Sequence, residues 1–119
     1  MNDAITTCAH LKQSVADMVN EREWNKFHTL KNLAMNVSVE AAELMELFLW
    51  CESDKSLSAF EENHQAVEHE LADVLIAVVA FANAANIDLA QVFERKIEEV
   101  KAKYPVALVR GKSDKYTAY

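Results

Sequence analysis

The fold of this 119-residue chain is decided by residues 69–82, which read HELADVLIAVVAFA. From Leu71 to Ala82 every residue is apolar except Asp73. The run contains no Gly or Pro, and it is shorter than the roughly 20 residues that a membrane-spanning helix needs. A helix that is apolar all round is buried all round. We therefore expect the central helix of an all-α domain here, buried on every side.

Two carboxylates, Glu70 and Asp73, enter this helix one turn apart and point in neighbouring directions. A buried charge costs free energy unless it is paired, protonated or bound to a metal. The presence of both acids in an apolar helix therefore needs an explanation.

Composition excludes several classes of protein. One Gly and one Pro favour long helices over a turn-rich β fold.

A net charge of −7 argues against binding a nucleic-acid backbone, and the charge of any phosphate ligand must be balanced by a few local cations or a bound metal. Cys8 and Cys51 have no disulfide or metal spacing, and the N-terminus has no signal-peptide pattern. We expect a cytoplasmic protein that binds neither nucleic acid nor membranes.

Apolar periodicity predicts four helices within a single domain, residues 1–119. They cover residues 2–20, 30–51, 58–85 and 89–103. Thr29, Ser58 and Asp88 are the expected caps of the last three helices, with Glu61 completing a capping box. Residues 21–28 are expected to form a connector, and residues 106–119 an irregular tail. Short connections favour a four-helix bundle. The outer face of residues 58–85 is more than a small bundle covers, so we expect a homodimer or homotetramer.

A second polar set follows the helix expected at residues 30–51. Asn32, Asn36, Glu40 and Glu43 recur at helical spacing along the edge of its apolar face. Pairs of acids three residues apart mean little alone, because 19 acidic residues placed at random give about three such pairs and the chain has three. Their role must therefore be inferred from their position relative to the apolar face of the helix and to the other acids.

Four carboxylates converge if the helices at 30–51 and 58–85 pack antiparallel. Glu40 and Glu43 would then face Glu70 and Asp73, and only a hard divalent cation readily stabilises such a group. All-oxygen ligation indicates Mg²⁺ or Mn²⁺. The alternative is that these acids form salt bridges to lysines or cap turns.

Two other metal chemistries are disfavoured by the motifs. A di-iron carboxylate bundle needs two Glu-x-x-His motifs, and the chain has one, Glu61 to His64. A zinc peptidase needs His-Glu-x-x-His, but Asp73 stands in place of the second His after His69.

The acidic motifs carry a family resemblance. Glu40-x-x-Glu43, followed after 26 residues by Glu70-x-x-Asp73, resembles the signature of the MazG-like all-α nucleoside triphosphate pyrophosphohydrolases. Flanking residues between 20 and 117 resemble the dCTPase-like branch of that family. These are Arg22–His28, Asn32–Leu33, Leu47–Trp50, Lys96, Tyr104–Pro105, Leu108, Arg110, Ser113 and Lys115–Thr117.

The resemblance implies hydrolysis of a nucleoside triphosphate to the monophosphate and pyrophosphate. It implies Mg²⁺ held by Glu40, Glu43, Glu70 and Asp73, with Glu40 or Glu43 orienting or deprotonating the attacking water. It favours a deoxynucleotide with a cytosine-like base first and an adenine base second, in a house-cleaning role.

Seven further residues are implied in substrate binding, and each has an ordinary structural alternative such as a core anchor or a solvated charge. Trp24, His28, Asn32 and Trp50 would form the base pocket. Lys96, Arg110 and Lys115 would balance charge on the leaving pyrophosphate.

The chain departs from its relatives at two positions: Val100 replaces an Asn that many of them carry, and Ala77 replaces a Tyr. Both bear on base, sugar and phosphate selection, not on the metal site. Two alternatives remain open: a catalytically silent helical interaction protein, and a phosphoribosyl-ATP pyrophosphohydrolase.

Overall fold

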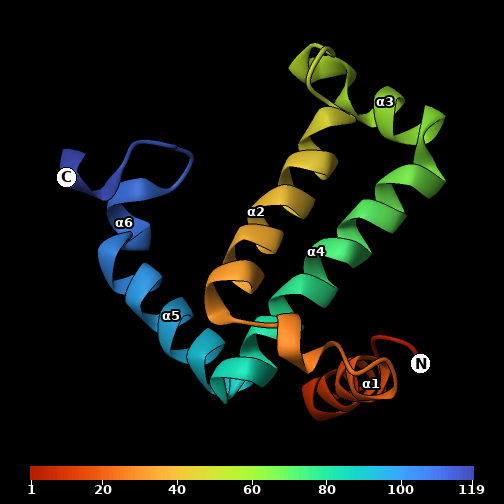
Figure 1. Cartoon of the computed structure of the whole chain (residues 1–119). Coiled ribbons are helices and arrows are strands. Elements are labelled where there is room, and N and C mark those ends of the chain that lie inside the picture. The colour runs from red at the N-terminus through yellow and green to blue at the C-terminus, as the bar shows by residue number, and fades with distance from the viewer. The chain divides into compact units, whose positions relative to one another are not determined.

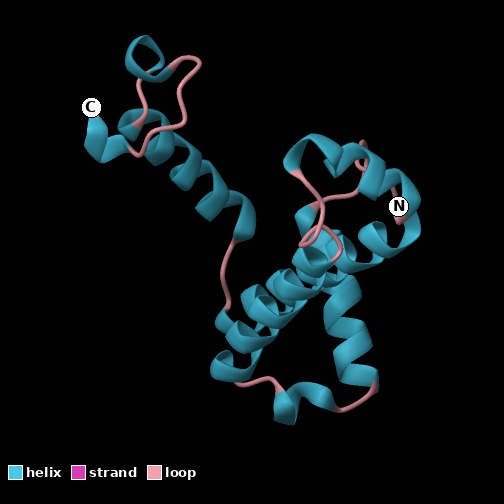
Figure 2. Ribbon diagram, turned by 90° about the horizontal axis from the view of Figure 1, so that it is seen from above, coloured by secondary structure: helices cyan, strands magenta, loops and turns pink.

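The computed structural model describes residues 1–119 and contains helices without strands (Figures 1 and 2). The all-α prediction is therefore confirmed. The chain divides into two compact units, Met1–Asn86 and Ile87–Tyr119, which are described separately. The prediction of a single domain stays a prediction. No single helix is both long and apolar enough to cross a membrane, and only His64–Ala85 and Leu89–Lys103 counted together reach that length and composition.

The first helix, α1, spans Cys8–Glu21 and starts later than expected. Asn2 does accept backbone N–H bonds from Ala4 and Ile5 at 3.0 and 3.2 Å, but they close only a short turn. The Thr7 hydroxyl then accepts from the backbone N–H of His10 at 3.1 Å and caps the helix itself. Trp24–Phe27 follows as a 3₁₀ helix in the expected connector.

Helix α2 spans Leu30–Glu46 and is capped as predicted, because the Thr29 hydroxyl accepts from the backbone N–H of Asn32 at 3.2 Å. It ends five residues before the expected residue 51. Residues 47–49 instead form tighter bonds to the carbonyl three residues back, at 3.0 to 3.4 Å. Such turns are frequent where an α-helix ends.

The single helix expected at residues 58–85 is two helices, α3 at Ser56–Glu62 and α4 at His64–Ala85, so that prediction was wrong. Asn63 has a non-helical backbone, with φ of −122° and ψ of 27°, and its side chain donates to the Ala59 carbonyl at 3.0 Å beside its own backbone N–H at 3.1 Å. The expected capping box at Ser58 does not form, because α3 has already begun two residues earlier. After α4, Asn86 takes a left-handed backbone conformation with φ of 54°, the usual end of a helix.

Helix α4 is the centre of the first unit. It packs antiparallel against α2 and also contacts α1 (Figure 1). The buried apolar residues are Val15, Val19, Leu33, Val67, Ala77, Val79, Ala80 and Ala82, most of them on α4.

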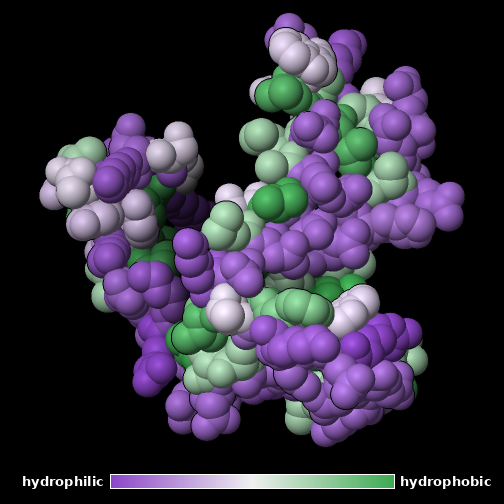
Figure 3. All heavy atoms as spheres, viewed as in Figure 1, coloured by the Kyte–Doolittle hydropathy of each residue, from purple (hydrophilic) through white to green (hydrophobic).

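Burial of α4 on every side was wrong for the single chain. Leu71, Leu75 and Ile76 remain 58%, 47% and 42% exposed, because α1 and α2 cover only part of its circumference. Apolar residues reach the surface among hydrophilic ones elsewhere as well (Figure 3).

The second unit is built on α5, Leu89–Lys103, capped as predicted by Asp88, which accepts from the Gln91 N–H at 3.0 Å. The tail expected to be irregular contains α6, Val106–Val109, and a 3₁₀ helix, Tyr116–Ala118. The Tyr116 ring packs edge-on against Tyr104, with centroids 6.0 Å apart, and this contact returns the tail to the end of α5.

Candidate metal centre

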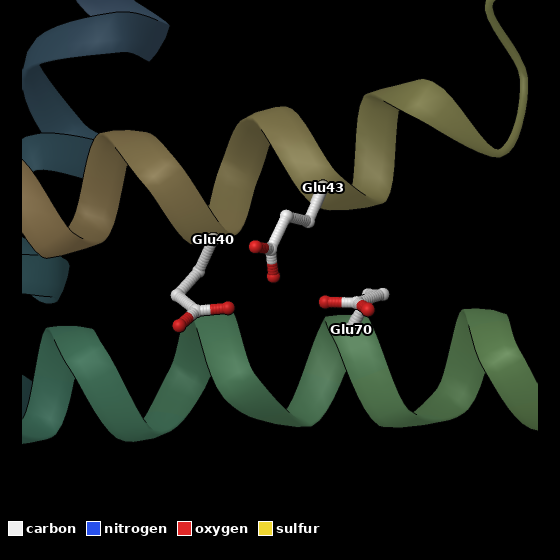
Figure 4. A group of neighbouring side chains, drawn as sticks. All are labelled: Glu40, Glu43 and Glu70. Carbon is white, nitrogen blue, oxygen red and sulfur yellow. The ribbon is translucent and has the colours of Figure 1, made fainter.

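Three of the four predicted ligands meet between α2 and α4. Glu40 and Glu43 extend from successive turns of α2, and Glu70 extends toward them from α4 (Figure 4). One carboxylate oxygen of each lies within 4.8 Å of the other two. Helices α2 and α4 pack antiparallel, which was the condition for the predicted convergence of the acids.

Asp73 lies one turn after Glu70 on α4, is exposed, and does not join that 4.8 Å group. Its negative charge nevertheless contributes to raising the pKa of both Glu40 and Glu70. Asp73 therefore acts electrostatically on Glu40 and Glu70.

Two carboxyl groups of the trio have perturbed pKa values. Loss of hydration is the main cause that raises the pKa of Glu40, followed by its hydrogen bond with Glu43 and the charges of the other acids. Loss of hydration is also the largest cause that raises the pKa of Glu70, followed by the charge of Glu43, while His69 lowers it. Ionisation of either carboxyl group therefore costs more free energy than it does in water.

Two oxygens of this centre lack partners. Oε2 of Glu40 and Oε2 of Glu70 are buried and accept no hydrogen bond. No lysine or arginine is among the groups that shift the pKa of either residue. The salt-bridge alternative is therefore unsupported for these two acids. Two unpaired buried carboxylate oxygens beside the exposed carboxylate of Glu43 fit a hard divalent cation such as Mg²⁺, which prefers oxygen ligands.

A cavity of about 350 Å³ lies one helical turn away from the acids along α2 and α4, and none of the acids lines it. Asn36, one turn before Glu40 on α2, and Ala77, one turn after Asp73 on α4, both line it. Its remaining walls come from α1, α2, α4 and the 3₁₀ helix.

The cavity brings together three of the residues predicted for base binding: Trp24, His28 and Asn32. The Asn32 side chain donates to the Phe27 carbonyl at 3.1 Å, and the Arg22 guanidinium lies 5.8 Å from the Trp24 ring centroid. Trp50 lies outside this cavity and is 92% exposed.

The three predicted cations belong to the second unit. Lys96 pairs with Glu99 at 3.0 Å, and Glu99 also pairs with Lys103 at 2.9 Å, which lowers the pKa of Glu99. Arg110 follows α6 and Lys115 precedes the last 3₁₀ helix.

Sequence reasoning did not find the α1 wall of the cavity. Val15, Met18 and Val19 line it from a helix far away in the chain. Their apolar spacing indicates a core-facing stripe, and nothing in that pattern distinguishes a cavity wall from ordinary packing.

Comparisons with known proteins agree on one family. The sequence model of the MazG-like family matches residues 35–118. The chain is 35% identical to dCTP pyrophosphatase 1 of Mus musculus and 33% identical to that of Homo sapiens, over 113 residues that cover 93% of this chain. It spans about two thirds, 66%, of the length of each of these two relatives.

A solved structure agrees with the sequence matches. The crystal structure of a pyrophosphatase from Archaeoglobus fulgidus superimposes with a TM-score of 0.80 at 35% identity. The match covers 88% of this chain and 98% of that one.

Proposed function

The chain belongs to the MazG-like family, and we propose that it is an enzyme that hydrolyses nucleoside triphosphates to the monophosphate and pyrophosphate with Mg²⁺. The observation that carries the proposal is the meeting of Glu40, Glu43 and Glu70, two of them with an unpartnered buried oxygen, beside a cavity. Deoxynucleotides of the dCTP type are the first candidates, because the curated relatives are dCTP pyrophosphatases. Those of the dATP type come second.

Glu40, Glu43 and Glu70 would hold the cation, with Asp73 completing the set. When bound, Mg²⁺ neutralises phosphate charge, orients the triphosphate and makes water a better nucleophile. Glu40 and Glu43 are the candidates for accepting the proton of the attacking water, because a raised pKa such as that of Glu40 moves a carboxylate toward the range of an effective base.

The cavity would hold the base. Trp24 offers a ring for stacking, and His28 and Asn32 offer polar atoms at its wall. Lys96, Arg110 and Lys115 would balance charge on the pyrophosphate. Trp50 lies outside the cavity, so its part in stacking on the base stays a prediction from the sequence. Cys8 and Cys51 are free thiols, as a cytoplasmic house-cleaning enzyme would have.

A panel of deoxynucleoside triphosphates tests the proposal. With Mg²⁺ we expect pyrophosphate release that EDTA abolishes. Phosphoribosyl-ATP belongs in the same panel, because its selective turnover would favour that alternative activity. Absence of turnover on every nucleotide would favour a catalytically silent interaction protein.

Single substitutions test the residues. Glu43→Gln and Asp73→Asn should each lower turnover about 100-fold or more, because each removes a negative charge from the site where Mg²⁺ is bound. Helix content by circular dichroism should stay unchanged. Glu46→Gln is the matched control, since Glu46 is an exposed acid of the same helix and should keep normal turnover. Near-normal turnover of the Glu43 or Asp73 variant would contradict the role of that residue.

A further inference from the structure

A second cavity, of about 390 Å³, lies beside the first. The two share Val15, Val19, His28 and Ala80 in their walls, so they are neighbouring compartments of one hollow. We call them the near and the far compartment.

The two compartments lie in a fixed order from the acids. On α4, Ala77 lines only the near compartment, Ala80 lines both, and Asn83 lines only the far one. With a rise of 1.5 Å per residue, Asn83 is about 15 Å beyond Asp73 along the helix. A nucleotide with its phosphates at the acids would reach the near compartment first and enter the far compartment only if its base is long enough.

The far compartment is the more polar one. Its lining includes three asparagines, Asn20, Asn25 and Asn83, and Glu23 makes the corner between the first two with a left-handed φ of 54°. The Asn25 amide donates to Oδ1 of Asn20 at 2.5 Å, and the Asn83 amide donates to the Lys12 carbonyl at 2.9 Å.

These two hydrogen bonds decide what the asparagines can offer a ligand. Each bond uses one of the two N–H groups of the Asn25 or Asn83 amide and leaves the side-chain oxygen of that residue as an acceptor. The bond from Asn25 uses the oxygen of Asn20 and leaves the Asn20 amide nitrogen as a donor. A donor beside acceptors matches the edge of adenine, which presents an amino group next to a ring nitrogen and which asparagine reads in two-bond contacts elsewhere.

We propose that the far compartment receives the second ring and polar edge of a purine, so that the chain accepts adenine-type deoxynucleotides as well as pyrimidine ones. A pyrimidine base would reach only the near compartment, and the asparagine side chains would then be hydrogen-bonded by water. Asn20, Asn25 and Asn83 are then specificity residues. The inference rests on the proposed function, because it requires the triphosphate to lie at the acids.

Binding of non-hydrolysable nucleotides tests the inference without turnover. Titration calorimetry with Mg²⁺ would compare the α,β-imido analogues of dATP and dCTP on the full chain. Ala84 is exposed and lines the far compartment, so Ala84→Leu fills that compartment without overpacking the core. It should weaken the dATP analogue at least about 10-fold and the dCTP analogue less than about 3-fold.

A second variant tests whether the Asn20 amide binds the polar edge of the purine. Asn20→Ala removes the free donor from an exposed position, and it should weaken the dATP analogue about 10-fold and spare the dCTP analogue. Ala102→Leu is the matched control for added bulk, because it is an exposed helical alanine that lines neither compartment. It should change neither affinity.

The outcomes separate the two proposals. If only the dCTP analogue binds, or if Ala84→Leu and Asn20→Ala affect both analogues alike or not at all, the purine compartment is wrong and the proposed function stands. If neither analogue binds the wild-type chain, both are wrong.

Discussion

At the scale of single residues, Glu40 and Glu70 show how the acid centre affects the stability of the metal-free protein. Loss of hydration is the main cause that raises the pKa of both carboxyls above the ordinary value of 4.5. The folded chain therefore binds these two protons more tightly than the unfolded chain does. The free energy of unfolding consequently falls as pH rises through the raised pKa values, and it is highest, as far as these two groups are concerned, below about pH 4.5.

Glu40→Gln should isolate this effect. In EDTA we expect its melting temperature to match that of the wild type near pH 4.5 and to exceed it increasingly toward pH 8, because the variant never carries the poorly hydrated charge. With Mg²⁺ the order should reverse, since only the wild type gains stability from binding the cation. Thermal unfolding followed by circular dichroism measures both. A variant that is less stable than the wild type in EDTA at pH 8 would contradict the electrostatic account.

The acid centre could be predicted largely from the sequence, because it depends on local spacing and on one packing choice. Glu40 and Glu43 share a helix edge, and a single antiparallel contact brings Glu70 to them. The far compartment could not be predicted, because Asn20 and Asn83 are 63 positions apart and meet only through the packing of α1 on α4. No residue pattern encodes a meeting of that kind.

At the scale of elements, the caps decide where helices begin and end. Thr29 and Asp88 were predictable because a cap is a contact between residues three apart. The break at Asn63 was missed because it is a non-helical backbone conformation at a single residue, whereas the apolar periodicity continues through it. The start of α1 was misplaced for a related reason, since Asn2 caps a turn that does not continue.

Asn86 gives a test at this scale. Its left-handed backbone suits Asn or Gly but not a β-branched residue. Asn86→Val should lower the free energy of unfolding by about 1–2 kcal/mol, whereas Asn86→Gly should change it little. Urea unfolding of both variants measures the difference. Equal stability of the Val and Gly variants would show that the end of α4 relaxes to another conformation.

At the scale of the whole molecule, the exposed side chains of α4 bear on assembly. Leu71 and Leu75, one turn apart, are 58% and 47% exposed, and together with Ala72, Val74 and Val78 they line an apolar hollow to which only α4 contributes. Contiguous exposed apolar surface of this kind marks protein contacts. The oligomer expected from the sequence stays a prediction, and this face of α4 is where we expect the subunits to meet.

Leu75→Glu should convert the expected homodimer or homotetramer to a smaller species, because it places a charge in the apolar contact. Sedimentation velocity of the wild type and the variant measures the change. Leu57→Glu is the control, since Leu57 is an exposed leucine of α3, 68% accessible, outside this face. A monomeric wild-type protein, or a Leu75→Glu variant of unchanged size, would exclude this face as the interface.

The end of α4 at Asn86 is also the boundary between the two units. All residues that converge on the proposed cation, and both compartments, belong to the part before it, while Lys96, Arg110 and Lys115 belong to the part after it. Under the proposed roles, substitutions in residues 87–119 would change how the leaving pyrophosphate is bound and would leave base selection unchanged. Under the same roles, a chimaera that joins residues 1–86 of this chain to the corresponding tail of a relative would keep the base preference of this chain and take its pyrophosphate contacts from the relative.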